Sequence, residues 1–297
     1  MKQPVFIGAA TAIVTPFFKG ELDQEAYLRI LKLQAESEIN AVVVCGTTGE
    51  ASTLNGQERK TLYQLTHTYL GKKKKWIAGI GTNSTSASIA LAKEAEAAGA
   101  DALLAVTPYY NKCTQRGLIE HYTAIADSTE LPLILYNVPS RTGVDISVES
   151  CKLLSQHPRI NGIKEAGGSI SKVAMIRSLC GNQLHIWSGN DDQTVPIMSL
   201  GGKGVISVLS NLCPNRVAKI CKACLKQNYH LAAQLQCNAL ALIQQLFCEV
   251  NPIPVKAALA SLRLCKNELR LPLTPISEEN REALLKSLSD YLTFPEE

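Results

Sequence analysis

Short apolar segments recur along the chain, and each is followed by a segment with the spacing of an amphipathic helix. Eight of them have the length and the branched side chains typical of buried strands, at residues 6–14, 41–45, 76–80, 102–106, 133–136, 160–164, 184–187 and 203–208. Residues 23–36 illustrate the helical spacing and begin with Asp23, a typical N-terminal cap. A second helix is expected at residues 84–98, which are rich in alanine and end at Gly99.

Continuously apolar strands that alternate with helices are typical of a parallel sheet covered by helices. Eight strand–helix units predict that this sheet closes, so the expected fold is an α/β, (β/α)8 TIM barrel. After about Asn215, helical segments follow one another without strands. We therefore expect two regions: a barrel that carries the active site at residues 1–224, and a helical C-terminal appendage at residues 225–297.

Composition and charge argue against several classes of protein. Lysine plus arginine number 30 against 26 acidic residues in a chain of 297, which is a mild excess. The only dense basic run, residues 72–75, has no interleaved aromatic residue, so nucleic-acid binding is not expected. No apolar run approaches the ~18 residues of a membrane span, so no membrane association is expected.

The ten cysteines are scattered along the chain. Cys221 and Cys224 form a Cys-x-x-Cys pair, but no second pair or histidine follows at the spacing of a zinc site. We interpret the cysteines as reduced, mostly buried thiols, which predicts a cytoplasmic location. The apolar stretch after Lys2 mimics a signal peptide, but prolines and a glycine interrupt it, and secretion is not expected.

Polar or conformationally special residues gather where the predicted strands end. In a barrel of this kind the chemistry lies at the carboxyl ends of the strands. Six expected strands end in such residues, at 46–50, 107–111, 136–143, 162–165, 188–191 and 205–207. Their convergence predicts a single site at the mouth of the barrel.

Lys164 is the most informative single residue, because it closes an apolar strand, whereas most other lysines lie on helix faces or in turns. A lysine in a barrel mouth is partly stripped of water, which favours the neutral amine that attacks ketones and forms a Schiff base. A structural lysine paired with Glu165 or another carboxylate is an equally open alternative from position alone. Lys203 is a rival nucleophile, but it begins its strand and is expected at the opposite end of the barrel.

Hydroxyl groups and an arginine accompany Lys164 at the expected mouth. Tyr136 ends its strand and can relay protons if other hydroxyls bond to it, although a packed aromatic side chain is the commoner role. The backbone N–H groups and two hydroxyls of residues 46–49 suit a carboxylate, although such loops are common. Arg141 follows on a loop over the mouth, where its planar fork suits a second carboxylate and a surface salt bridge is equally compatible.

Motifs for several other kinds of chemistry are missing from the sequence. The chain has no Gly-x-x-x-x-Gly-Lys-[Ser/Thr] motif and no His-Glu-x-x-His motif, and its five histidines form no ligand cluster. Residues 167–169 could hold a phosphate at a helix start, although glycines there more commonly only let the loop turn. We expect neither a metal nor an organic cofactor.

With these motifs, the chain resembles the N-acetylneuraminate lyase and dihydrodipicolinate synthase family of class I aldolases. The similarity covers nearly the whole length, and its motifs are Gly8-Ala9-x-Thr11-Ala12-x-x-Thr15-Pro16-Phe17, Gly46-Thr47-Thr48-Gly49-Glu50, Tyr136-Asn137-x-Pro139, Gly162-x-Lys164-Glu165 and Asn251-Pro252-Ile253-Pro254-Val255-Lys256. Residues 108–111 and 140–143 resemble the synthase branch in particular. The resemblance implies a lyase that condenses pyruvate with L-aspartate 4-semialdehyde on the diaminopimelate route to lysine.

The resemblance also implies catalytic roles for four residues. Lys164 would form the Schiff base with pyruvate, and Tyr136 would donate and accept protons. Thr47 would link Tyr136 to Tyr110, which in the family enters from the neighbouring subunit. The shared tyrosine implies a dimer at least, and usually a homotetramer built as two dimers.

Four further residues are implied in substrate binding. Thr48 would hold the pyruvate carboxylate together with Thr47, and Arg141 would bind the carboxylate of the semialdehyde. Gly189 and Ile206 would complete the pyruvate pocket through backbone groups. No metal enters this set.

One departure from the family pattern concerns regulation by lysine. Members that lysine inhibits place histidines and a glutamate around a cleft at the dimer interface. The matching positions here are Gly56, Arg59 and Ala87, although Asn83 and Tyr109 remain. A bound lysine would lose the carboxylate partner of its ε-ammonium and meet an added cation, so weak or absent feedback inhibition is expected.

Two alternatives stay open. Another aldolase of the same family would act on sialic acid or a keto-deoxy sugar acid, but a polyol chain requires hydroxyl and amide partners where this chain has Arg141. A non-catalytic barrel that acts as a binding subunit would leave its mass unchanged after treatment with pyruvate and borohydride. The complete set of residues that the resemblance requires disfavours this second alternative.

Overall fold

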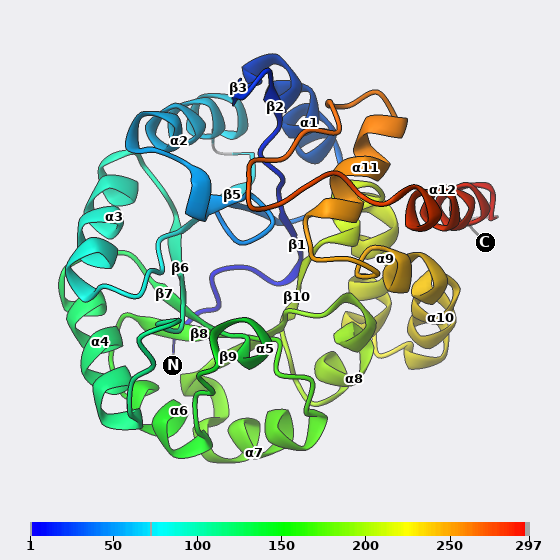
Figure 1. The fold of residues 1–297 in the computed structure, drawn as a ribbon. Helices are drawn as coiled ribbons and strands as arrows, with labels where there is room; N and C mark the ends of the chain where they lie inside the picture. The colour runs from blue at the N-terminus through cyan, green and yellow to red at the C-terminus, as the bar shows by residue number, and fades with distance from the viewer. Residues whose placement is uncertain (1, 72, 295–297) are drawn as a thin grey trace.

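Eight parallel strands form a closed barrel in the order β1-β10-β9-β8-β7-β6-β5-β4 in the computed structural model, which describes residues 2–71 and 73–294. The barrel strands are β1 (Gly8–Ala12), β4 (Ala41–Val44), β5 (Lys75–Gly79), β6 (Ala102–Val106), β7 (Leu133–Asn137), β8 (Ile160–Glu165), β9 (His185–Ser188) and β10 (Gly204–Ser207). Figure 1 looks into this barrel, with the helices arranged around the strands. The predicted (β/α)8 fold is confirmed.

The predicted strands agree with the observed ones to within two residues at each end. The largest difference is at β1, which spans Gly8–Ala12 rather than residues 6–14. Phe6 lies before the strand, and its ring stacks on Trp187 inside the barrel, with 5.0 Å between the ring centroids. At the other end the backbone N–H of Val14 donates to the side chain of Asn211 instead of to a strand, at 3.2 Å.

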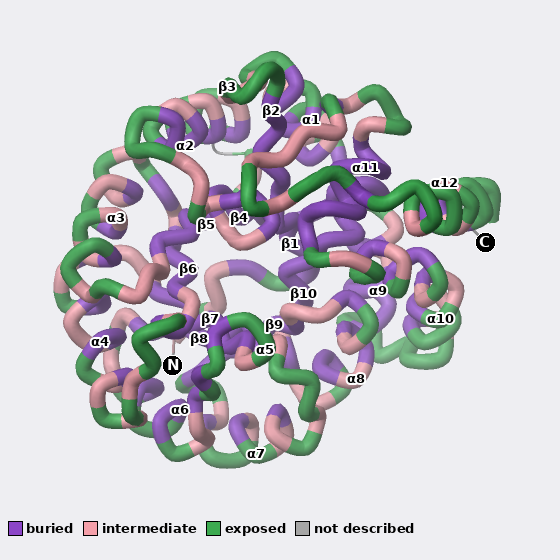
Figure 2. The backbone as a smooth tube through the Cα atoms, in the orientation of Figure 1, coloured by how far each residue is buried: buried purple, intermediate pink, exposed green. Residues whose placement is uncertain are grey.

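Two apolar cores explain why the barrel closes. Side chains inside the barrel form one core, which includes Ala10, Ala41, Ile77 and Trp187. A larger core lies between the outer surface of the strands and the inner faces of the helices. Figure 2 shows this arrangement, with the strands buried and the exposed residues mainly on the outer faces of the helices. The alternation of buried strands and amphipathic helices in the sequence therefore reflects two layers of packing.

The helices around the strands begin and end close to the predicted positions. In α1 the Asp23 carboxylate accepts a hydrogen bond from the N–H of Ala26 at 2.9 Å, which confirms the predicted cap. Ser84 caps the second expected helix, α3. The helices of the ring are α1 (Gln24–Glu36), α2 (Gly56–Leu70), α3 (Thr85–Ala97), α4 (Gln115–Asp127), α6 (Val148–Leu154), α7 (Ile170–Cys180), α8 (Thr194–Ser199) and α9 (Pro214–Leu225). The short helix α5 (Pro139–Thr142) lies inside this ring, near the strand ends (Figure 1).

A short antiparallel hairpin was not predicted. It pairs β2 (Phe17–Phe18) with β3 (Glu21–Leu22) after the first barrel strand. Each strand is only two residues long, which is too short to produce an alternating pattern in the sequence.

Three helices follow the ring: α10 (Tyr229–Gln245), α11 (Ile253–Ser261) and α12 (Glu278–Thr293). They lie to one side of the barrel beside α9, and the segment between α11 and α12 crosses back toward α1 and α2 (Figure 1). Within that segment, Arg270 forms an ion pair with Glu58 of α2. The division into residues 1–224 and 225–297 stays a prediction.

The structure shows how the cysteines and the basic run at residues 72–75 are placed. In the described chain no disulfide joins the cysteines, and seven of the ten are buried, whereas Cys237 and Cys248 are exposed. Of the basic run, Lys72 lies outside the described residues, and Lys74 donates to two backbone carbonyls near the end of α1. None of the helices in the described residues has the length and apolar character needed to cross a membrane.

Candidate active site

Lys164 lies near the carboxyl end of β8, in register with Tyr136 on the neighbouring strand β7. The lysine is buried, and its Nζ lies 4.3 Å from the centroid of the Tyr136 ring. Lys203, the rival nucleophile, immediately precedes β10 and therefore lies at the opposite, amino end of the strands. The amine at the mouth of the barrel is that of Lys164, as the sequence predicts.

Glu165 does not pair with Lys164, because consecutive residues on a strand point to opposite faces. Its buried carboxylate instead accepts hydrogen bonds from Asn137 Nδ2 at 3.0 Å and from the backbone N–H of Gly167 at 2.6 Å. Lys172 lies 3.9 Å away on the same side. The alternative in which Glu165 neutralises Lys164 is therefore wrong, and burial raises the pKa of the Glu165 carboxyl.

The same hydrogen bond bears on the phosphate alternative for residues 167–169. The N–H of Gly167 is bonded to Glu165, and the Ser169 side chain caps α7 by accepting from the N–H of Lys172 at 3.2 Å. These contacts agree with the simpler interpretation, in which the glycines let the loop turn.

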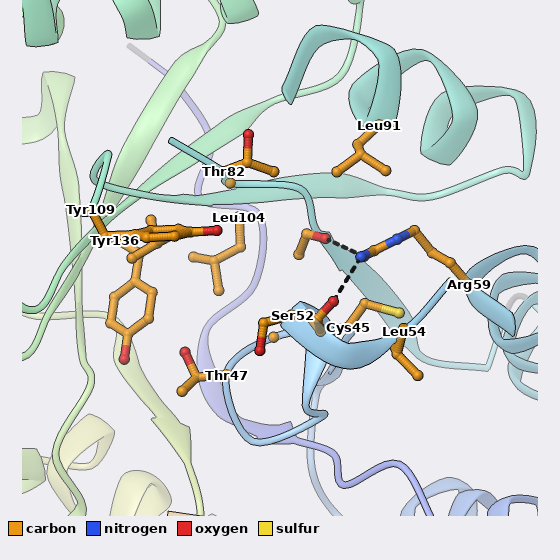
Figure 3. A pocket seen from close by; sticks show the side chains of 15 residues that line it. Cys45, Thr47, Ser52, Leu54, Arg59, Thr82, Leu91, Leu104, Tyr109 and Tyr136 are labelled. Carbon is orange, nitrogen blue, oxygen red and sulfur yellow. Dashed lines mark hydrogen bonds between the residues drawn. The ribbon is translucent and has the colours of Figure 1, made fainter. Parts of the chain in front are cut away.

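A cavity of about 360 Å³ lies beside Tyr136 at the ends of β4, β5 and β6. Tyr136 and Thr47 lie on one side of it and Arg59 of α2 on the other (Figure 3). Tyr109, from the loop after β6, also contributes to the wall. The cavity therefore adjoins the ring on which the Lys164 amine packs.

Arg59 holds the far side of the cavity in place. Its guanidinium donates to the backbone carbonyls of Ala51 at 3.0 Å and Gly79 at 3.4 Å, which Figure 3 draws as dashed lines. Cys45 lies beside it, and burial raises the pKa of the Cys45 thiol to about 12. Burial therefore favours the protonated thiol over the thiolate.

The loop that carries Thr47 and Thr48 is fixed by a buried ion pair. Its last residue, Glu50, has φ of 50°, a left-handed conformation that non-glycine residues rarely adopt. The Glu50 carboxylate pairs with Lys256 of α11 at 2.6 Å, and both side chains are almost completely buried. The second carboxylate oxygen accepts from the backbone N–H of Arg270 at 3.1 Å.

Thr48 and Arg141, the two expected carboxylate-binding residues, meet at Asn251. The Nδ2 atom of Asn251 donates to Thr48 Oγ1 at 3.0 Å, and the Nη2 atom of Arg141 donates to the Asn251 carbonyl oxygen at 3.1 Å. Arg141 extends from the short helix α5 and remains largely exposed. It forms no surface salt bridge among the described residues, contrary to that alternative.

Gly189 lies close to Lys164, and Ile206 lies on the next strand of the barrel after β9. A Cβ atom at Gly189 would lie only 3.1 Å from Cε of Lys164, so the glycine allows the β9 loop to approach the lysine closely. Ile206 is buried on the neighbouring strand β10. Between the two strand ends, the Asp191 carboxylate accepts from the backbone N–H groups of Val208 and Leu209 at 2.9 and 3.1 Å.

Tyr110 does not reach the site within its own chain. Its side chain is 91% exposed, and its backbone has φ of 68°. An exposed tyrosine with a left-handed backbone is unusual, since neither burial nor local geometry favours it. Of the eight expected site residues, Tyr110 is the one that this chain does not bring to the mouth.

Three residues that support the site had no assigned function from sequence reasoning. Asn251, Lys256 and Arg270 all lie in the C-terminal region, and each contacts residues 48–58. Asn251 and Lys256 fall in a family motif, which could have indicated a functional contact. The described residues contain no group of three or more histidine, cysteine, aspartate and glutamate side chains arranged to hold a metal ion.

A closed α/β barrel with a buried lysine and a tyrosine paired at the carboxyl ends of adjacent strands defines the class as a barrel enzyme, a lyase. The model of the dihydrodipicolinate synthetase family matches residues 5–291, and the chain belongs to this family.

Individual relatives agree over nearly the whole length. A 4-hydroxy-tetrahydrodipicolinate synthase from Alkaliphilus oremlandii is 48% identical over 96% of this chain and 98% of its own length. The structure of a chloride-inhibited dihydrodipicolinate synthase from Acinetobacter baumannii, complexed with pyruvate, is 42% identical with a TM-score of 0.95, covering 96% of this chain and 99% of that one. A monomeric dihydrodipicolinate synthase variant is 43% identical with the same TM-score and covers 97% of both chains.

Proposed function

We propose that this chain acts as a 4-hydroxy-tetrahydrodipicolinate synthase that binds pyruvate as a Schiff base on Lys164. The observation that carries the assignment is the buried amine of Lys164, which packs against the Tyr136 ring at the mouth of the barrel. The second substrate is L-aspartate 4-semialdehyde, and the product enters the diaminopimelate route to lysine. The family and the names of the relatives support this activity.

The proposed reaction uses two groups at the mouth of the barrel, the amine of Lys164 and the phenol of Tyr136. The neutral Lys164 amine attacks C2 of pyruvate, and loss of water leaves an imine whose protonated form withdraws electrons from C3. Tyr136 removes a proton from C3 and gives an enamine, and this carbon attacks the aldehyde carbon of the semialdehyde. Tyr136 returns the proton to the aldehyde oxygen, which becomes the hydroxyl group of the product. The amino group of the added substrate then attacks C2, which releases Lys164 as the free amine and closes the ring.

The two carboxylates of the substrates require two different binding groups. We assign the pyruvate carboxylate to Thr47, Thr48 and the backbone groups of Gly189 and Ile206. We assign the semialdehyde carboxylate to Arg141, whose guanidinium is held over the mouth by the carbonyl of Asn251. An exposed arginine at this position suits a carboxylate better than the polyol chain of a sugar acid, which disfavours the sugar-acid lyase alternative.

The proposal extends to assembly and location. We propose that Tyr110 enters the site of a neighbouring subunit in a homotetramer built from two dimers. The high exposure of its side chain in the single chain supports this role. The absence of disulfides among the described cysteines fits a reducing compartment, so we place the enzyme in the cytoplasm. No cofactor takes part in the steps above.

Reduction of the complex with borohydride tests the proposal directly. Wild-type protein incubated with pyruvate should gain the mass of one reduced pyruvate adduct, on the peptide that contains Lys164. The Lys164→Ala variant should gain nothing and lose condensation activity, whereas Lys203→Ala, at the other end of the barrel, should be labelled as wild type. An adduct on another lysine, or an active Lys164→Ala variant, would refute the assignment.

A further inference from the structure

The side chain of Asn251 contacts Thr48, one of the residues assigned to the pyruvate carboxylate. Asn251 lies between α10 and α11, is only 5% exposed, and donates from Nδ2 to Oγ1 of Thr48, which is 3% exposed. The carbonyl oxygen Oδ1 of the same side chain is buried without a partner in the described structure. The bond to Thr48 is therefore the one hydrogen bond recorded for the Asn251 side chain in the described residues.

The direction of this bond matters for a hydroxyl group, which carries a single proton. Because Thr48 Oγ1 accepts from Asn251, its own proton remains available for another acceptor. Within the described residues the Thr48 hydroxyl donates to no protein atom. A substrate carboxylate, which only accepts hydrogen bonds, is the partner that such a hydroxyl suits.

We propose that Asn251 is a positioning residue that turns the Thr48 hydroxyl proton toward the pyruvate carboxylate. The inference rests on the proposed function, because it needs a carboxylate bound at Thr48. It also explains how the C-terminal region participates in a site built on the barrel, since residues 48 and 251 are 203 positions apart.

The backbone of Asn251 contacts Arg141, the residue assigned to the semialdehyde carboxylate. Arg141 donates to the backbone carbonyl of Asn251, which a change of side chain leaves in place. Substitutions of the side chain should therefore act on pyruvate and spare the semialdehyde. This separation distinguishes a positioning role from a general loss of structure, which would affect both substrates.

Steady-state kinetics of two variants test the inference. Asn251→Ala leaves the Thr48 proton without orientation and should raise KM for pyruvate about three- to tenfold, with kcat nearly unchanged. Asn251→Asp has the same shape but accepts the Thr48 proton and adds a negative charge, so its KM for pyruvate should rise further. In both variants KM for the semialdehyde should stay within about twofold of wild type.

A double-mutant cycle with Thr48→Val decides whether the effect passes through Thr48. If it does, Asn251→Ala should raise KM for pyruvate no further in the Thr48→Val background. Additive effects, or a KM for pyruvate that Asn251→Ala and Asn251→Asp leave unchanged, would overturn the inference. Should Asn251→Ala fail to fold, the cycle is run with Asn251→Asp, whose shape matches asparagine.

Two controls separate the possible failures. Asn228→Asp makes the same chemical change in the C-terminal region, where the side chain only caps α10, and aspartate caps equally well, so kinetics should not change. Borohydride trapping of pyruvate by the wild-type protein tests the proposed function by itself. If trapping succeeds and Asn251→Ala behaves as wild type, the inference alone is wrong; if trapping at Lys164 fails, the proposed function is wrong.

Discussion

At the scale of single residues, the Lys164 side chain is restricted by its neighbours. The Tyr136 ring covers the amine, and Gly189 lies close to the methylene next to it. Such packing reduces the number of conformations open to a long flexible side chain, and an amine held in place reacts faster than a mobile one. The absence of a side chain at position 189 is thus part of how the lysine is placed.

Gly189→Ala should therefore slow Schiff-base formation. Its Cβ would lie 2.7 Å from Cβ of Ala166, which must shift, and 3.1 Å from Cε of Lys164, so the lysine side chain must also give way slightly. A displacement on this scale should lower the rate of borohydride trapping about ten- to a hundredfold. The rate is measured by mass spectrometry at a fixed, subsaturating pyruvate concentration.

Gly117→Ala is a matched control, because the added Cβ would meet Cys113 and Thr114 only at ordinary contact distances of 3.5 and 3.7 Å. It should trap pyruvate at the wild-type rate. A Gly189→Ala variant that folds and traps as fast as wild type would show that the close approach does not matter.

At the scale of elements, α11 fixes the loop after β4. Lys256 extends from α11 to Glu50, and its Nζ also lies 4.4 Å from the centroid of the Phe17 ring. Burial lowers the pKa of Lys256, while the charge of Glu50 acts in the opposite direction. Without Lys256 the carboxylate would be buried beside a backbone already in a left-handed conformation.

Lys256→Met should destabilise the protein by about 3–5 kcal/mol, because it leaves a buried carboxylate without its cation. Urea unfolding followed by circular dichroism measures the change in free energy. The double variant Glu50→Gln/Lys256→Met should recover much of the loss, since no charge is then left unpaired. Lys286→Met, an exposed change on α12, should stay within about 0.5 kcal/mol of wild type.

An equal loss of stability in Lys256→Met and in the double variant would contradict this explanation. Such a result would mean that the methylene packing of Lys256, and not its charge, holds the loop.

At the scale of the whole molecule, the isolated chain has an incomplete set of proposed catalytic residues. Seven of the eight expected site residues lie at or next to the mouth, and Tyr110 points into solvent. If Tyr110 serves a neighbouring subunit, two different inactive chains should restore one another. One of the similar structures is a monomeric dihydrodipicolinate synthase variant, so a shared site has to be tested for this chain directly.

Mixing Tyr110→Phe with Lys164→Ala should regain activity when the two are unfolded and refolded together. A mixed dimer would then contain one site with both Lys164 and Tyr110 intact, whereas neither parent would have any. Condensation activity is assayed before and after refolding, and light scattering reports the oligomer. Activity that stays at the level of the two parents, in a mixture shown to form mixed oligomers, would rule out the shared site.

Regulation is also a property of the assembled molecule, and we predict weak or absent inhibition by lysine. Gly56 has open space around it, Ala87 offers no carboxylate, and Arg59 already occupies the cavity wall with its charge. A lysine ammonium near Arg59 would be repelled. Initial rates at saturating pyruvate should be unchanged by millimolar lysine, and appreciable inhibition below that range would disprove the prediction.

The pattern of amino acids was sufficient to predict the closed barrel and the place of Lys164 at its mouth. The barrel strands are buried on both faces and most helices of the ring on one, so the period of the apolar residues indicates the layers directly. Lys164 could be found because a lysine that ends an apolar strand is conspicuous, and the carboxyl ends of parallel strands meet at one edge. These inferences need only local spacing and the geometry of the fold class.

The contacts between individual side chains could be found only in the folded structure. Glu165 follows Lys164 in the chain but bonds to Asn137 and Gly167, and the partner of Thr48 lies 203 residues away. The buried pair of Glu50 and Lys256 likewise joins residues 206 positions apart. Contacts of this kind depend on how distant elements pack, and a sequence pattern with a period of two or 3.6 residues carries no information about them.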